Sequence, residues 1–190
     1  MRQRPSEIGF TIIELVLVLA VFAVLSAMAV PALSAFGERM KLGQGQREVE
    51  RELQMARLKA VTANRRMRVL FNCPAAGQYR RVEVLGSALD DAADRCSEAK
   101  YPILPPDRNP LTRPNFDGAV RYLPRTVSFG AASGLEFAPD GTVMYQSGGV
   151  WIDVPDPDGT AVTLTKTGMS VVASITVNHL GKIQPVQLPY

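Results

Sequence analysis

Residues 9–36 read GFTIIELVLVLAVFAVLSAMAVPALSAF, and this stretch decides the fold. From Leu15 to Phe36 all 22 residues are apolar or small. A helix of that length spans about 33 Å, and the hydrocarbon core of a bilayer is about 30 Å thick. Arg2 and Arg4 precede the stretch and favour a cytoplasmic N-terminus. The pattern predicts a single-pass membrane anchor.

An ordinary secretory signal peptide has a different order of parts. Its apolar run covers about 7–15 residues and is followed by a small-residue cleavage site. Here the apolar run is longer, and the small residue Gly9 comes before it. Cleavage after Gly9 would therefore leave the helix on the mature chain. A plain membrane anchor, without cleavage, stays open from composition alone.

Glu14 is the one charged residue inside the apolar stretch. A carboxylate in a membrane helix costs roughly 2.5–3.5 kcal/mol on insertion scales, and a plain anchor gains nothing from it. Cleavage at Gly9–Phe10 would give Phe10 a free amine one helical turn from Glu14. In a staggered stack of helices, the carboxylate would pair with a neighbour's amine and set the register. The alternative is a Glu tolerated near the membrane edge.

The junction Gly9-Phe10-Thr11-Ile12-Ile13-Glu14-Leu15 resembles the class III leader of type IV pilins and type II secretion pseudopilins. The resemblance implies that a prepilin peptidase cuts after Gly9 and methylates the new N-terminal Phe10. It also implies that Glu14 guides assembly. Pro31 falls where these proteins often carry a proline that interrupts the helix. A proline removes one helical hydrogen bond and can kink the helix there.

The chain divides by composition into four segments. A leader at 1–9 and a transmembrane assembly helix at 10–36 are followed by a periplasmic amphipathic helix at 37–66, with a joint expected around Gly37–Gly45. Its apolar residues recur in steps of three and four, which predicts one buried stripe: Val49, Leu53, Ala56, Ala60, Ala63 and Met67. A periplasmic β-rich domain is expected over 67–190.

Beyond Met67 the apolar period becomes that of strands. The predicted strands are Met67–Phe71, Tyr79–Leu85, Thr126–Phe129, Leu135–Phe137, Thr142–Gln146, Ala161–Thr165, Val171–Val177 and Lys182–Gln187. Turns are expected at Pro139-Asp140-Gly141 and Asn178-His179-Leu180-Gly181. The predicted fold class is α+β, a long N-terminal helix packed on a mostly antiparallel β-sheet domain, as in pilins.

A polar, proline-rich loop occupies 86–124 and has no periodicity. Such a loop is usually functional or mobile. The two cysteines of the chain, Cys73 and Cys96, flank its start. Outside the cytoplasm a disulfide is their natural state, and it would contribute on the order of 3 kcal/mol in the chain-entropy model. Two unpaired thiols are the alternative.

The second half of the chain carries a further resemblance. The run Glu52–Val61, continued by Asn64-Arg65-Arg66, resembles the helix of H-type minor pseudopilins and FimT-like minor pilins. The turn Phe137–Gly141 and the final hairpin around Gly181 are similar too, whereas the loop 86–124 departs from the pattern. The resemblance implies a structural subunit of a type II secretion pseudopilus or, alternatively, a minor pilin of a type IV pilus that contacts DNA during uptake.

The same resemblance implies where the chain resides and what it meets. The expected location is the bacterial inner membrane, with a single pass and the C-terminal domain in the periplasm. The expected partners are the prepilin peptidase, other pseudopilins or pilins in a helical filament, the inner-membrane assembly platform and the lipid bilayer.

Catalysis, cofactors and metals find little support. The chain has one histidine, His179, and neither a Gly-x-Ser-x-Gly elbow nor a phosphate-binding glycine loop. Asp153, Asp156 and Asp158 offer oxygen ligands, but the two intervening prolines and the lack of a downstream Glu are unlike an EF-hand. We therefore expect no catalytic, metal or cofactor residues.

DNA binding is the more serious alternative. Basic residues cluster at Arg65, Arg66, Arg68, Arg80 and Arg81, and a basic face would hold phosphates in a salt-dependent manner. Glutamates are interspersed, however, and the net charge is only +3. Strand alternation places Arg66 and Arg68 opposite Met67 and Val69, so solvation also explains these arginines. DNA is the less favoured partner.

Overall fold

The computed structural model describes residues 11–103, 114–130 and 134–186. The chain forms two compact units, Met1–Met40 and Lys41–Tyr190. Helix α1, Ile12–Ala63, begins in the first unit and ends in the second. At its start, the Thr11 hydroxyl accepts a hydrogen bond from the Glu14 amide (3.3 Å), which is typical of an N-cap.

The first unit consists of the N-terminal part of α1. Five consecutive side chains on it are each 41–63% exposed, so every side of the helix there is apolar: Leu15, Val16, Leu17, Val18 and Leu19. Among the described residues, no helix combines the length and sustained hydropathy that a membrane crossing requires.

Helix α1 is continuous through the positions where an interruption was expected. Pro31 lies within α1, so the predicted break of the helix there is corrected. Gly37, Gly43 and Gly45 also lie within α1, and the boundary between the two units, after Met40, falls inside the range predicted for a joint. A proline removes only one backbone donor, and the hydrogen bonds on either side of it can hold the helix together.

Helix α1 ends three residues before the predicted boundary at Arg66. Asn64 adopts a left-handed conformation (φ 50°), which ends the helical run. The Arg65 amide donates to the Ala60 carbonyl (3.1 Å) and the Asn64 amide to the Val61 carbonyl (3.4 Å). These two bonds form a Schellman motif, which satisfies carbonyls at the C-terminus.

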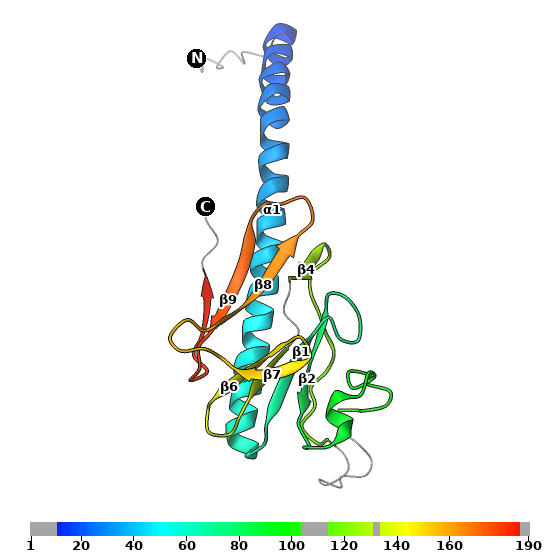
Figure 1. Ribbon diagram of the computed structural model, residues 1–190. Helices are drawn as coiled ribbons and strands as arrows, with labels where there is room; N and C mark the ends of the chain where they lie inside the picture. The colour runs from blue at the N-terminus through cyan, green and yellow to red at the C-terminus, as the bar shows by residue number, and fades with distance from the viewer. Residues whose placement is uncertain (1–10, 104–113, 131–133, 187–190) are drawn as a thin grey trace, which may run out of the picture. The chain divides into compact units, whose positions relative to one another are not determined.

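The second unit contains two antiparallel sheets (Figure 1). The six-stranded sheet has the order β3-β2-β1-β5-β6-β7, and the four-stranded sheet has the order β10-β9-β8-β4. The bounds of the first sheet are Arg121–Tyr122 (β3), Gln78–Glu83 (β2), Met67–Phe71 (β1), Gly134–Phe137 (β5), Val143–Ser147 (β6) and Val150–Asp153 (β7). Those of the second are Ile183–Val186 (β10), Val172–Val177 (β9), Thr160–Lys166 (β8) and Val127–Phe129 (β4), and a 3₁₀ helix η1 covers Ala88–Asp91.

The α+β prediction is confirmed, and every predicted strand has a counterpart in the described residues. Two short strands, β3 and β7, were not predicted. β7 follows a two-residue turn at Gly148-Gly149, where both glycines have positive φ (57° and 84°). Such turns match the twist of hairpin strands. β3 has only two residues and depends on pairing with β2, so it leaves no periodic signal.

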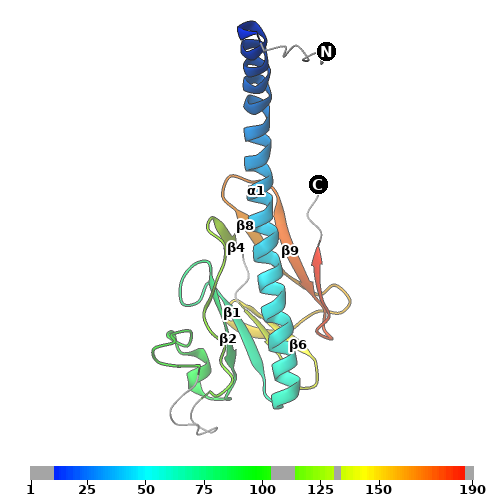
Figure 2. The same cartoon turned by 180° about the vertical axis from the view of Figure 1, so that it is seen from behind.

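The core of the second unit lies between α1 and the sheets. Figure 2 shows the α1 segment of this unit in front of the strands. Its predicted stripe is fully buried at Val49, Leu53, Ala56 and Ala60. The sheets contribute an aromatic group in which Phe129 lies 4.8 Å from Phe71 and 5.6 Å from Tyr79, measured between ring centroids.

Strand alternation gives the six-stranded sheet two different faces. Met67 and Val69 of β1 belong to the apolar core, so Arg68 and Leu70 point to the opposite face. Arg80 pairs in register with Leu70, and Glu136 with Arg68, so both share this second face. It is a charged surface of the sheet, and Arg68, Arg80 and Glu136 on it are all buried.

Candidate functional site

The predicted assembly segment is only partly described. Gly9 and Phe10 lie outside the described residues. Glu14 is exposed in the first turn of α1, among exposed apolar side chains. A carboxylate in a first turn interacts favourably with the helix dipole, and here it stands at the edge of an apolar surface.

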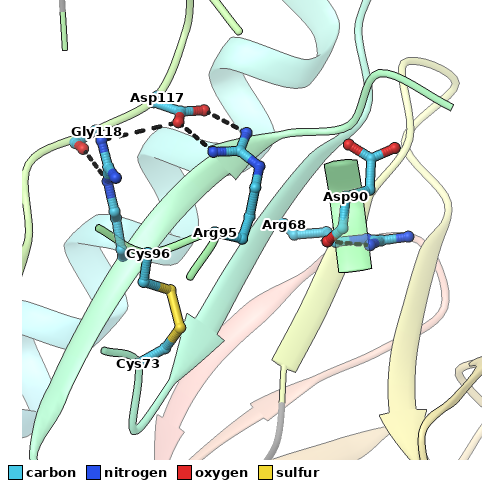
Figure 3. Close-up of a disulfide and its surroundings, with 8 residues drawn as sticks. Arg68, Cys73, Asp90, Arg95, Cys96, Asp117 and Gly118 are labelled. Atoms are coloured by element: carbon cyan, nitrogen blue, oxygen red, sulfur yellow. Dashed lines mark hydrogen bonds and ion pairs between the residues drawn. A yellow bond between two sulfur atoms is a disulfide. The ribbon is translucent and has the colours of Figure 1, made fainter. Parts of the chain in front are cut away.

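The second feature is the loop that follows β2, which a disulfide joins to the β1–β2 connection (Figure 3). Cys73 and Cys96, predicted as a candidate pair, are bonded in the structure, with their Cα atoms 5.7 Å apart. Cys96 is buried. The bond holds the start of the loop against the charged face of the six-stranded sheet.

A buried carboxylate, that of Asp117, lies at the centre of the loop's attachment. Its oxygens accept from the Arg95 guanidinium at 2.5 and 2.8 Å, a bidentate pair. It also accepts from the Glu83 amide of β2 at 2.8 Å and lies 3.8 Å from Arg80. The side chain is fully buried, so the loop and the strand share one desolvated anion.

Arg80 is fully buried between the sheet and the loop. It donates to the carbonyls of Gly118 (2.8 Å) and Tyr101 (2.5 Å), both in the loop. Burial lowers the pKa of its guanidinium, and nearby Asp117 counteracts that shift. Arg95 reaches back to the Glu83 carbonyl (2.8 Å) and stacks over the Tyr101 ring, 4.8 Å from the centroid. Each arginine thus bridges a strand and the loop.

A second group of contacts holds the loop around η1. The Asp90 carboxylate accepts from the amides of Leu85, Gly86 and Ser87, which forms a capping box with Ser87. Arg68 donates to Glu136 (2.6 Å) and Asp91 (3.1 Å). It also donates to the Asp90 carbonyl (3.4 Å), as Figure 3 shows. The described parts of the 86–124 loop therefore form an ordered cover on the sheet.

The five arginines considered for DNA do not form a free basic face. Arg80 is fully buried and Arg68 nearly so. Arg81 pairs with Glu52 at 2.9 Å. Arg65 and Arg66 are about half exposed, but they pair with Glu83 (3.8 Å) and Glu136 (3.1 Å). The expectation that solvation explains Arg66 and Arg68 is wrong for Arg68, which is buried and pairs with Glu136, whereas Arg66 is about half exposed to solvent.

The sequence did not predict the carboxylates that pair with these arginines, Asp117 and Glu136, or the further arginine of the network, Arg95. These three residues come from distant parts of the chain, and no motif links them. The one sequence feature that pointed to such a network was the content of arginine and aspartate in and around the loop.

In the described ranges, no group of three or more His, Cys, Asp and Glu side chains is placed to hold a metal ion.

Comparison with known proteins identifies the N-terminal segment. Residues 4–30 match the family model described as the prokaryotic N-terminal methylation motif. The matched range includes Gly9, Phe10 and Glu14, the residues predicted for cleavage, methylation and assembly.

Two solved structures are similar to this chain. Both are crystal structures of the type IV minor pilin FimU of Pseudomonas aeruginosa. One is 16% identical, with 81% of this chain and 96% of that chain covered and a TM-score of 0.49. The other is 15% identical, with 78% and 97% covered and a TM-score of 0.46. No curated protein sequence gives a significant match.

Removing the disulfide tests how much the loop depends on it. We predict that Cys73→Ser with Cys96→Ser lowers the free energy of unfolding by about 3 kcal/mol, because the bond closes a loop with a separation of 23 residues. Urea unfolding of the full chain in detergent measures the change. Reducing agent should destabilise the wild type to a similar extent and leave the double variant unaffected. Equal stability of both chains would contradict the role of the bond.

Removing the central carboxylate tests the charge network. We predict that Asp117→Ala costs about 3–5 kcal/mol, because Arg95 and Arg80 lose their buried anion. The matched control is Asp94→Ala, which removes an exposed pair with Lys100 and should leave the unfolding curve unchanged. The same urea titration compares the two. A similar small effect for both variants would show that the loop does not need Asp117.

Proposed function

We propose that this chain is a non-catalytic minor subunit of a type IV pilin-class filament, anchored in the bacterial inner membrane with its β-rich domain in the periplasm. The observation that carries the proposal is the methylation motif at residues 4–30. The matched range includes the Gly9–Phe10 junction proposed for cleavage and also Glu14, which lies in the first turn of the long helix α1.

The exposed apolar side chains at the start of α1 support an anchoring and packing role. Ile12 and Ile13 are 83% and 77% exposed, and the apolar surface continues from there along the helix. A soluble protein rarely leaves so large an apolar surface in water, so lipid or neighbouring helices are its natural cover. The anchor itself is argued from the sequence of residues 15–36 taken whole, which is long enough to cross a bilayer.

Glu14 gives this packing a register. Once the prepilin peptidase has cut after Gly9, the amine of Phe10 and the carboxylate of Glu14 lie one helical turn apart. When subunits stack with a stagger, the carboxylate meets the amine of a neighbour, and a misplaced subunit leaves a charge unpaired in an apolar bundle. Head-to-tail contacts of this kind do not close, so they extend into a fibre that an inner-membrane assembly platform can build.

The proposed machine is the type II secretion system, with this chain as an H-like pseudopilin. The support is the resemblance of the helix run Glu52–Val61, the turn Phe137–Gly141 and the hairpin around Gly181. A FimT-like minor pilin of a type IV pilus is the second candidate, since the same residues resemble that group. The structure gives no support for DNA contact, because carboxylates pair with all five arginines considered for it: Arg65, Arg66, Arg68, Arg80 and Arg81.

N-terminal processing is the direct test of the proposal. We predict that chain purified from the membranes of its own cells begins at an N-methylated Phe10. Intact-mass and N-terminal peptide mass spectrometry measure this. Cells without a prepilin peptidase provide the control, in which Met1 should remain. Mature chain that still starts at Met1 in the presence of the peptidase would overturn the proposal.

The register role of Glu14 has its own test. We predict that Glu14→Ala inserts and is cleaved normally but is recovered in sheared filaments at a level several-fold below wild type, because its carboxylate no longer pairs. Glu14→Gln should behave likewise, since it keeps the shape and loses the charge. Val16→Leu serves as the control for a change in the same helix. Immunoblots of filament and membrane fractions give the readout, and unchanged incorporation would remove this role.

The choice of machine is tested by deleting the gene. For a pseudopilin, we predict that exoproteins accumulate in the periplasm while twitching and transformation stay normal. Export assays and motility assays on the same strain, with the gene restored in trans as control, separate the two. Normal secretion together with lost pili would favour the minor-pilin alternative.

A further inference from the structure

An open groove lies between α1 and the β9–β10 hairpin, wholly within the second unit. We name it the basic groove; it has a volume of about 470 Å³, and its lining consists of Gln54, Arg57, Leu58, Val61, Gly181, Lys182 and Ile183. Leu58 and Val61 form an apolar floor and are 56% and 52% exposed. The two charged residues of the lining are both basic.

The hairpin is shaped to sit closely on Arg57. Gly181 has a φ of +71°, and a Cβ there would come within 3.0 Å of Arg57 Nε and 3.1 Å of the Gly141 carbonyl oxygen. The glycine therefore permits both the turn and the close approach. Arg57 in turn donates to the Leu180 carbonyl at 3.2 Å. The groove is thus held in shape by backbone geometry.

The two basic residues of the groove differ from the other arginines of the domain in their surroundings. Neither Arg57 nor Lys182 has an ion pair within the part of the chain that the structure describes. The arginines around the six-stranded sheet differ, since carboxylates lie beside Arg66, Arg68, Arg81 and Arg95. A basic rim around an exposed apolar floor fits a segment that combines apolar side chains with carboxylates.

This chain itself presents such a segment at the free edge of its larger sheet. Among the described strands, β7 pairs with β6 alone, so its other edge has no strand partner there. We name as the acidic edge Val150, Ile152 and Asp153 of β7 together with Asp156 and Asp158 of the connection between β7 and β8. Val150 and Ile152 are 62% and 44% exposed. The three aspartates have no ion pair with any described residue. Proteins usually shield an exposed apolar edge strand, so we expect another chain to pack against the free edge of β7.

We propose that the basic groove of one copy receives the acidic edge of a second copy. In Figure 1 β7 lies in front, and in Figure 2, seen from behind, the α1 segment of the same unit lies in front. The two surfaces therefore face different sides of the domain, and their contact is head-to-tail, which extends a row of subunits. This inference rests on the proposed filament function.

Protein is favoured over nucleic acid as the occupant. A phosphate backbone would use Arg57 and Lys182 but would leave the apolar floor of Leu58 and Val61 without a partner. Val150 and Ile152 supply that partner, and the aspartates supply the charge. The ion pairs at an exposed rim then set orientation, while the apolar floor contributes the burial.

Site-specific cross-linking of the full chain in its native membranes tests the contact. A photoreactive p-benzoyl-phenylalanine in place of Leu58 should cross-link to a second, differently tagged copy, within the peptide that spans residues 150–158. Arg57→Glu with Lys182→Glu should lower the dimer yield about tenfold, as should Asp156→Lys with Asp158→Lys. Mixing the two reversed chains should restore the yield. Arg51→Glu, exposed on the same helix but outside the groove, is the control and should change nothing.

Three outcomes would overturn the contact. One is a cross-link that maps away from residues 150–158, and another is a charge reversal that mixing does not restore while the variants melt at the wild-type temperature. The third is a low-salt gel shift with duplex DNA that Arg57→Glu with Lys182→Glu abolishes, which would make the groove a nucleic-acid site. Cleavage at Phe10 is scored in the same sample. Correct cleavage without a cross-link overturns this contact alone, whereas absent cleavage overturns the proposed function.

Discussion

Helix α1 carries two different apolar surfaces, and each needs a different cover. Around Leu15–Leu19 the side chains are apolar and exposed on every side of the helix. Within the second unit a single stripe, which includes Val49, Leu53 and Ala56, is fully buried against the sheets. The stripe is satisfied inside the domain, whereas the all-round apolar surface requires lipid or other helices. The proposed anchor and filament roles follow from that difference.

The larger sheet faces a similar constraint, met in a different way. Its core face packs apolar side chains under α1, while its other face carries Arg68, Arg80 and Glu136 and is closed by the loop after β2. Asp117, Arg95 and the disulfide hold that cover in place. A buried ion pair offers less net stability than an apolar contact, because both charges lose water. We interpret the network as fixing one arrangement of an otherwise irregular loop.

The balance of charge also distinguishes the surfaces of the domain. Arginines around the larger sheet are matched with internal carboxylates, which removes the basic face that their clustering in the sequence suggested. Arg57 and Lys182, beside an apolar floor, have no such partner among the residues that the structure describes. Charges that are satisfied internally stabilise the fold, and those that are not are available to a neighbour. In this chain the second kind lies beside α1 and along the edge of β7.

The sequence by itself determined the features that depend on neighbours along the chain. The leader junction, the apolar helix, the buried stripe from Val49 to Ala60 and most of the strands arise from local pattern and period. Tertiary structure alone decided which groups pair with Arg68, Arg80 and Arg95. It also decided how the loop after β2 is held on the sheet and where the short strands β3 and β7 form. It also overrode the local preference for a break at Pro31. Contacts between distant residues carry no periodic signal. A cluster of charged residues therefore looks the same in the sequence whether its side chains are solvated or paired with buried carboxylates.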